Sequence, residues 1–115
     1  MESLDLVFHA LADGTRRSML LRLAKVKDAT VSELSEPYAI SLAAASKHLQ
    51  VLERAGLVLK SRERRIVRCR LSLEPLDEAS NVLERYREFW RKRLDGLERF
   101  LDEGAPPGRH GRKRR

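Results

Sequence analysis

Ser41-Leu-Ala-Ala-Ala-Ser-Lys-His-Leu-Gln-Val-Leu-Glu-Arg-Ala-Gly56 is the stretch that decides the fold of this chain. Its apolar residues recur at steps of three and four, which predicts that they line one face of a helix. Ser41 is a good N-cap, and Gly56 suits the left-handed conformation that ends many helices. The residues expected on the inner face are Leu42, Ala45, Leu49 and Leu52.

The opposite face of this helix carries short or hydrogen-bonding side chains, one cation and no acid. Such a face can enter a major groove and touch base edges, although an ordinary amphipathic surface helix would show the same apolar spacing. Lys47 is expected to meet phosphate, and Ser46, His48 and Gln50 are the favoured base readers. The residues expected to face DNA are Ser41, Ala44, Ser46, Lys47, His48 and Gln50.

Three helices are predicted before this stretch. The first spans residues 4–11, and the second runs from the cap Asp13 to about Val26 with Met19, Leu20 and Leu23 inward. Lys27-Asp28-Ala29 is expected to be a turn, after which Thr30-Val31-Ser32-Glu33 fits a capping box that begins a short third helix. Pro37 stops that helix, so it and the 41–56 helix form a helix-turn-helix.

After Gly56 the apolar period changes to two, which predicts two antiparallel strands over residues 57–73 with Glu63-Arg64-Arg65 at the tip. The tip lacks the Asn-Gly or Asp-Gly pair that is typical of a tight turn, so a longer connection between the strands is the alternative. This hairpin is similar to the wing of a winged-helix domain, and its arginines suit a narrow minor groove and flanking phosphates. A charged hairpin kept soluble by arginine is the alternative. The wing residues expected to contact DNA are Arg62, Arg64, Arg65 and Arg68.

A long helix is predicted from Pro75 to about Asp102, with apolar residues at steps of three and four throughout. Its broad apolar stripe suggests burial against a second chain, and packing on its own domain is the alternative. Residues 104–115 read as a disordered linker followed by a basic tail, either a phosphate-binding segment or a solvated end.

Composition sets further bounds. The net charge is +7, and residues 41–74 hold eight basic and three acidic side chains, which favours a polyanionic partner. No run of about 18 apolar residues and no secretory signal are recognisable. The single cysteine, Cys69, falls on the inward set of the second strand, which predicts a buried thiol and suits a reducing cytoplasm.

Two stretches resemble ArsR-type (ArsR/SmtB) winged-helix regulators. Residues 8–17 are similar to the opening of that family, whose usual form has proline where Gly14 stands, and residues 41–57 are similar to its recognition helix. The resemblance covers about residues 4–101 and implies transcriptional control at an operator. It also implies a homodimer made by the first and last helices, here through Leu4, Phe8, Leu83, Tyr86, Phe89, Trp90 and Leu97.

The metal ligands that some members of this family use are absent from the matching positions. Residues 31–36 hold no cysteine and the last helix holds no histidine, so zinc or a thiolate-bound arsenical lacks its ligands. The chain therefore resembles the metal-independent branch, whose recurring aromatic cluster is matched by Tyr86, Phe89 and Trp90. The family often uses an inducer, and the sequence identifies none.

The expected fold is mostly α with a small β-hairpin: a winged helix-turn-helix domain over residues 1–103, followed by the basic tail. The expected function is that of a cytoplasmic, dimeric, sequence-specific DNA-binding regulator, with repression as the favoured mode and no cofactor or metal. One alternative is a non-specific DNA-coating protein, and another is a protein-interaction module that uses the aromatic face of the last helix. No constellation typical of an enzyme is recognisable.

Overall fold

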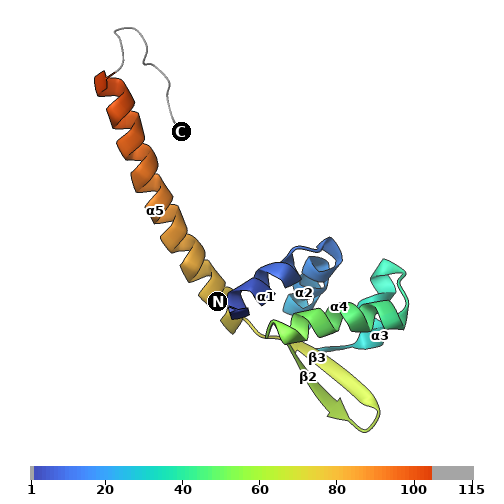
Figure 1. Ribbon diagram of the computed structural model, residues 1–115. Coiled ribbons are helices and arrows are strands. Elements are labelled where there is room, and N and C mark those ends of the chain that lie inside the picture. The colour runs from blue at the N-terminus through green and yellow to red at the C-terminus, as the bar shows by residue number, and fades with distance from the viewer. Residues whose placement is uncertain (1, 105–115) are drawn as a thin grey trace. The chain divides into compact units, whose positions relative to one another are not determined.

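The computed structural model describes residues 2–104, so all of the tail predicted at 104–115 except Gly104 lies outside the described residues. The fold is mostly helical (Figure 1). One short strand lies between the second and third α-helices, and two more lie between the fourth and the last. The chain divides into two compact units, one up to Ser80 and one from Asn81 onward. The elements are α1 (Glu2–Leu11), α2 (Gly14–Lys25), β1 (Ala29–Thr30), α3 (Val31–Ser35), the 3₁₀ helix η1 (Glu36–Tyr38), α4 (Leu42–Arg54), β2 (Val58–Glu63), β3 (Ile66–Leu71) and α5 (Glu74–Gly104).

The first unit holds a single hydrophobic core to which helices and strands both contribute. Burying an aliphatic side chain stabilises a fold by about 1.5–3 kcal/mol, so these residues fix the packing of the unit. Six of the side chains predicted to face inward from α2 and α4 are buried in it, which confirms the helical period of both segments. They are Met19, Leu20, Leu23, Ala45, Leu49 and Leu52.

Leu42 departs from this pattern, since it was expected inside and is 56% exposed. It is the first residue of α4 and lies almost one turn before Ala45, the first α4 residue of the core. The helical period correctly gives the direction of Leu42, but the hydrophobic core does not reach the first turn of α4, so the side chain stays exposed. Val26, the approximate end predicted for this helix, is the C-cap of α2; it has extended backbone and is exposed.

Local side chains begin the helices as the sequence predicted. The Asp13 side chain accepts from the backbone N–H of Arg16 and caps α2. Thr30 and Glu33 form the reciprocal capping box of α3, in which each side chain accepts from the other's backbone N–H. Ser41 Oγ accepts from Ala44 N at 3.1 Å and caps α4. These contacts satisfy backbone donors that a helix start would otherwise leave unpaired.

The end of α4 is fixed by Gly56, which has φ +80° as predicted. Gly56 N donates to Glu53 O and Leu57 N donates to Leu52 O, the two hydrogen bonds of a Schellman motif. Leu52 and Leu57 are both fully buried, which supplies the apolar contact of that motif. The chain therefore leaves α4 in one defined direction, into β2.

Strands β2 and β3 form the predicted antiparallel hairpin, with Val58 opposite Leu71 and Glu63 opposite Ile66. Arg64 and Arg65 make a tight two-residue turn between the strands. The turn is therefore short, although the sequence lacks the Asn-Gly pair that usually marks such turns. The hairpin projects from the helical part of the first unit (Figure 1).

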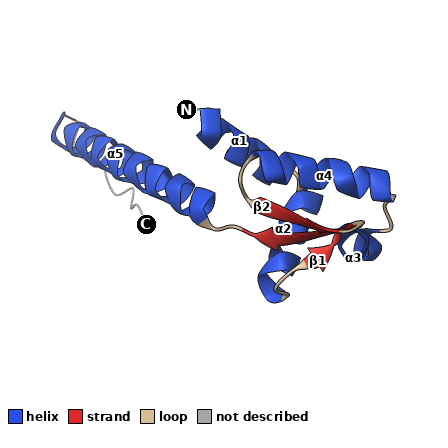
Figure 2. Cartoon of the chain, turned by 90° about the horizontal axis from the view of Figure 1, so that it is seen from below, coloured by secondary structure: helices blue, strands red, loops and turns tan. Residues whose placement is uncertain are grey.

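A third strand, β1, was not predicted. Ala29 pairs with Cys69 and Thr30 with Arg68, so the sheet has the order β1-β3-β2 (Figure 2). Ala29, which was expected in a turn, is therefore in this strand and is buried. This strand could not be predicted from the sequence pattern because two residues are too few to show an alternation of apolar and polar side chains. The strand with which it pairs also lies about 40 residues further along the chain.

The second unit consists, within the described residues, of the part of α5 from Asn81 to Gly104. Its large apolar side chains are exposed in the single chain, and the Phe89 and Trp90 rings meet edge to face with centroids 5.5 Å apart. Nowhere in residues 2–104 is there a helix that combines the length and apolar character needed to cross a membrane. The exposed apolar residues are Leu83, Tyr86, Phe89, Trp90, Leu94, Leu97, Phe100 and Leu101.

Candidate nucleic-acid interface

The face of α4 opposite the core is exposed and polar. At 100° per residue, Lys47 and Gln50 lie almost opposite Ala45 and Leu49, and both are exposed. Ser46 is exposed at one edge of this face, and Ala44 is half-buried at the other. The structure thus brings four of the six predicted α4 residues to one accessible face or its edges.

The charge on this face is positive. The first turn of α4 holds no acid, and its backbone N–H groups carry the positive end of the helix dipole. The acid nearest the other end, Glu53, is paired with Lys60 of β2 at 3.2 Å between Oε1 and Nζ. The carboxylate of Glu53 is therefore neutralised locally, and Lys47 and Arg54 remain as exposed cations on α4.

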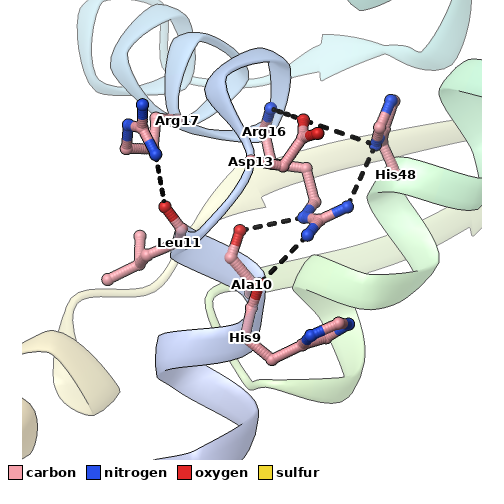
Figure 3. Close-up of polar contacts among 7 residues, drawn as sticks. All are labelled: His9, Ala10, Leu11, Asp13, Arg16, Arg17 and His48. Atoms are coloured by element: carbon pink, nitrogen blue, oxygen red, sulfur yellow. Dashed lines mark hydrogen bonds and ion pairs between the residues drawn. The ribbon is translucent and has the colours of Figure 1, made fainter.

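His48 lies differently from the other predicted residues. Its side chain is only 25% exposed, because it sits on the edge of α4 that faces the α1–α2 junction. Its Nδ1 atom is 3.3 Å from Arg16 Nη1 and 4.0 Å from Asp13 Oδ2 (Figure 3). Helix α4 and the capped start of α2 therefore meet at this histidine, and only part of its ring remains open to a ligand.

Arg16 and Arg17 close the C-terminus of α1. Arg16 donates from Nε to Ala10 O at 2.8 Å and from Nη2 to His9 O at 3.0 Å. Arg17 donates from Nη1 to Leu11 O at 2.7 Å (Figure 3). Cations at a helix C-terminus satisfy its last carbonyls and oppose its dipole, so both arginines hold α1 against the start of α2.

Asp13 is tied into the same junction. The backbone N–H of Arg16 donates to Asp13 Oδ2 at 3.1 Å, and this hydrogen bond, together with the Arg16 guanidinium, lowers the pKa of Asp13. Asp13 therefore stays ionised at neutral pH and serves as both helix cap and local counter-charge.

The wing presents its arginines in different directions. Arg62 shares the core-side face of the sheet with Val67, which stands opposite it in β3. Arg64 and Arg65 occupy the turn itself, and all three arginines are exposed. Arg64 has φ +59°, a left-handed conformation in which glycine or asparagine is usual.

The side chain of Arg68, which was expected to contact DNA, is held in an ion pair within the chain. It lies on the opposite face of the hairpin and donates from Nη1 to Asp28 Oδ1 at 3.0 Å. Both side chains are a little under half exposed. This ion pair connects β3 to the loop before β1, so Arg68 supports the sheet as well as adding charge.

Two further exposed cations were missed by the sequence reasoning. Arg54 follows Lys47 by seven residues and Gln50 by four, so it extends the outward face of α4. Arg70 is exposed on the same sheet face as Arg68. The helical period alone identifies Arg54 as a member of this face.

Cys69 is completely buried in β3, as predicted, and burial raises the pKa of its thiol. Among the side chains that the structure describes, no three His, Cys, Asp or Glu residues gather as potential metal ligands. The cationic and hydrogen-bonding surfaces of α4 and the wing are features that suit a polyanionic ligand.

Comparisons with known proteins agree on one class of fold. A family model described as "Helix-turn-helix domain" matches residues 11–60. The HTH-type transcriptional regulator Rv2034 of Mycobacterium tuberculosis is 37% identical over 100 residues, which cover 85% of this chain and 88% of that protein.

Solved structures extend this similarity. An ArsR-like transcriptional regulator from Rhodococcus sp. RHA1 matches with a TM-score of 0.75 and 32% identity, covering 86% of this chain and 92% of that one. A homodimeric winged helix-turn-helix DNA-binding domain from Mycobacterium bovis shares the fold, with a TM-score of 0.58 and 24% identity over 83% of this chain and 84% of that one.

Proposed function

Because the chain belongs to the ArsR family of winged helix-turn-helix transcriptional regulators, we propose that it is a homodimeric, sequence-specific repressor. The observation that carries this proposal is the polar outward face of α4, which has no acid in its first turn and whose later acid, Glu53, is paired with Lys60. A wing with exposed arginines follows it directly. A dimer seated on an operator would block access to a promoter, and the compartment in which it acts is the cytoplasm, where that DNA lies.

In this proposal α4 enters the major groove. Ser46 and Gln50 read base edges, since a hydroxyl and a carboxamide both donate and accept hydrogen bonds. Ser41 and Ala44 allow close approach at the N-terminal end of the helix, and Lys47 binds phosphate. His48 contributes through the exposed edge of its ring.

The wing supplies sequence-independent affinity. Arg62, Arg64 and Arg65 contact flanking phosphates or the adjacent minor groove, where negative potential is concentrated. Arg68 adds to this potential from within its ion pair with Asp28, and is expected to contribute less because its charge is already partly compensated.

The proposed dimer uses α1 and α5. Phe8 of α1 and the exposed aliphatic and aromatic residues of α5 supply the apolar area that a second copy would cover, with a smaller share from Leu4, which is partly buried against the core of its own unit. The Mycobacterium bovis domain, which shares this fold, is homodimeric, and this supports a dimeric state without identifying the helices that pair. Two copies related by a two-fold axis would read half-sites about one helical turn apart, or a multiple of it.

We also propose that DNA binding does not depend on a metal. Helix α3 contains no cysteine, and α5 contains no histidine, so the ligand sets of the metal-sensing members are not reproduced at either place. An apo protein prepared with chelator should therefore bind and release DNA as the untreated protein does.

The test is selection of bound fragments from a genomic DNA pool, followed by titration of the selected sequence and of random DNA. A specific regulator is expected to prefer its operator by about a thousandfold or more, and light scattering should report a dimer. Equal affinity for both DNAs would instead indicate a DNA-coating protein. A monomer that binds no DNA would indicate a protein-interaction module.

The roles assigned to α4 can be separated with two variants. Gln50→Ala should lower the preference for operator over random DNA by about 5- to 100-fold, because a base contact is lost. Lys47→Ala should weaken binding to both DNAs alike and reduce the salt dependence by about one charge. Equal losses on both DNAs for Gln50→Ala would remove Gln50 from the set of base readers.

A further inference from the structure

The contact between Arg16 and His48 restricts where the histidine carries its proton. A guanidinium has only N–H donors, so in a hydrogen bond across the 3.3 Å between Arg16 Nη1 and His48 Nδ1 the imidazole nitrogen is the acceptor. In the neutral imidazole the proton then lies on Nε2. Figure 3 shows this second ring nitrogen directed away from Arg16 and Asp13.

Arg16 is well placed to impose this choice because its guanidinium is itself fixed. Two carbonyls at the end of α1, those of His9 and Ala10, accept from its Nη2 and Nε. Asp13 is the other charged group at the ring, and its Oδ2 atom lies 4.0 Å from Nδ1, beyond hydrogen-bonding distance. The nearer contact is therefore the one in which Nδ1 accepts.

We propose that Arg16 is a positioning residue for DNA recognition: it holds His48 in the Nε2–H tautomer, so that α4 presents a hydrogen-bond donor at that point. This inference rests on the proposed function. A donor selects acceptors, such as N7 or O6 of guanine, O4 of thymine or a phosphate oxygen, and discriminates against the amino group of cytosine. Arg16 thus affects base preference through His48, without touching DNA itself.

The matched control is Arg17, the next residue along α2. It closes the same helix end through Leu11 O, and no contact joins it to His48. Arg16→Met and Arg17→Met therefore both remove a cation from the α1 terminus, whereas only Arg16→Met removes the acceptor requirement at His48. Circular dichroism and thermal melting of both variants measure the shared structural effect.

The first measurement is a long-range ¹H–¹⁵N correlation spectrum of the free wild-type protein at mildly alkaline pH. The His48 signals are assigned by their loss in His48→Gln. We expect the Nε2–H pattern in the wild type and in Arg17→Met, and a mixture of tautomers in Arg16→Met. An Nδ1–H pattern in the wild type, or an unchanged pattern in Arg16→Met, would overturn the proposal.

The second measurement is DNA discrimination. Arg16→Met should lower the preference for operator over random DNA by about tenfold, whereas Arg17→Met should change it by less than about twofold. In a His48→Gln background, Arg16→Met should have no further effect, because the two residues act through one contact. Equal losses for the two arginine variants would reduce Arg16 to a structural role. The wild-type spectrum requires neither DNA nor an arginine variant, so failure of the proposed function leaves the tautomer result intact.

Discussion

Arg64 occupies the turn of the wing with φ +59°, a conformation that costs an L-residue about 1 kcal/mol. Its neighbour Arg65 is also in the turn and has no positive φ. A strained arginine kept where glycine would be more stable is consistent with a role for its charge.

We expect Arg64→Gly to raise the free energy of unfolding by about 0.5–1 kcal/mol and to weaken DNA binding, with a log–log salt slope smaller by about one. Arg65→Gly is the matched control: it removes the same charge but should lower stability, because glycine there only increases the entropy of the unfolded chain. Urea unfolding and DNA titrations at several salt concentrations measure both effects. A lower free energy of unfolding in Arg64→Gly than in the wild type would contradict the proposal that the backbone at Arg64 is strained.

Asp13 connects helix capping to pH. Its pKa is lowered in the folded chain, so its carboxylate stabilises the fold above its unfolded pKa of about 4, and this contribution is lost as the pH falls through the folded pKa. Asp13→Asn keeps a good N-cap but removes the charge.

The variant should therefore be less stable than the wild type at neutral pH, and the difference should shrink below about pH 4. Urea unfolding midpoints measured from acid to neutral pH would show the two curves converging on the acid side. Parallel curves over this range would exclude Asp13 as a source of the acid dependence.

At the scale of an element, helix ends are set by backbone conformation. Gly56 ends α4 with φ +80°, and a Cβ added there would lie 3.2 Å from Pro75 Cγ. Gly14 begins α2 without a positive φ, and a Cβ there would meet only Arg17 Nη2 at 3.8 Å. The residue before it, Asp13, has the extended conformation that proline tolerates in its predecessor.

Opposite outcomes are expected at these two glycines. Gly56→Ala should lower the free energy of unfolding by about 1 kcal/mol or more, because it adds a left-handed alanine and a tight contact. Gly14→Pro should raise it by about 0.4–1 kcal/mol, since proline suits the first position of a helix and restricts the unfolded chain. Thermal melting compares the two, and a stabilised Gly56→Ala would contradict the left-handed C-cap.

At the scale of the whole molecule, the apolar residues of α5 are exposed in the single chain. Leu97 is 52% exposed and Trp90 is 58% exposed, and this is unusual for a helix that would face only water. If a second copy covers them, each substitution counts twice in the symmetric interface.

Leu97→Glu should therefore raise the dimer dissociation constant by about a hundredfold or more, with the helical content of the separate chain preserved. Arg99→Glu is the control, because Arg99 is two residues further along and lies on nearly the opposite side of α5. Light scattering over a range of concentrations measures both. A dimer that Leu97→Glu leaves unchanged would place the interface elsewhere.

The sequence by itself determined the features that arise within a few residues of one another. The helical periods of α2 and α4, the caps at Asp13, Thr30 and Ser41, and the left-handed Gly56 are local, because a helix forms its hydrogen bonds over four residues. The hairpin also followed from a period of two in adjacent segments. These features are sufficient to predict a winged helix-turn-helix, and the exposure of Lys47 and Gln50 follows from the same period.

The tertiary structure alone decided what depends on residues far apart in the chain. Strand β1 exists because β3 pairs with it, and Arg68 is held by Asp28, 40 residues away. His48 has the right residue type for a base reader, yet it lies on the edge of α4 that faces the α1–α2 junction, where Arg16, 32 residues earlier, contacts one of its two nitrogens. A pattern along the chain reports the direction of a side chain, whereas its free hydrogen-bonding groups depend on the neighbours that folding brings to it.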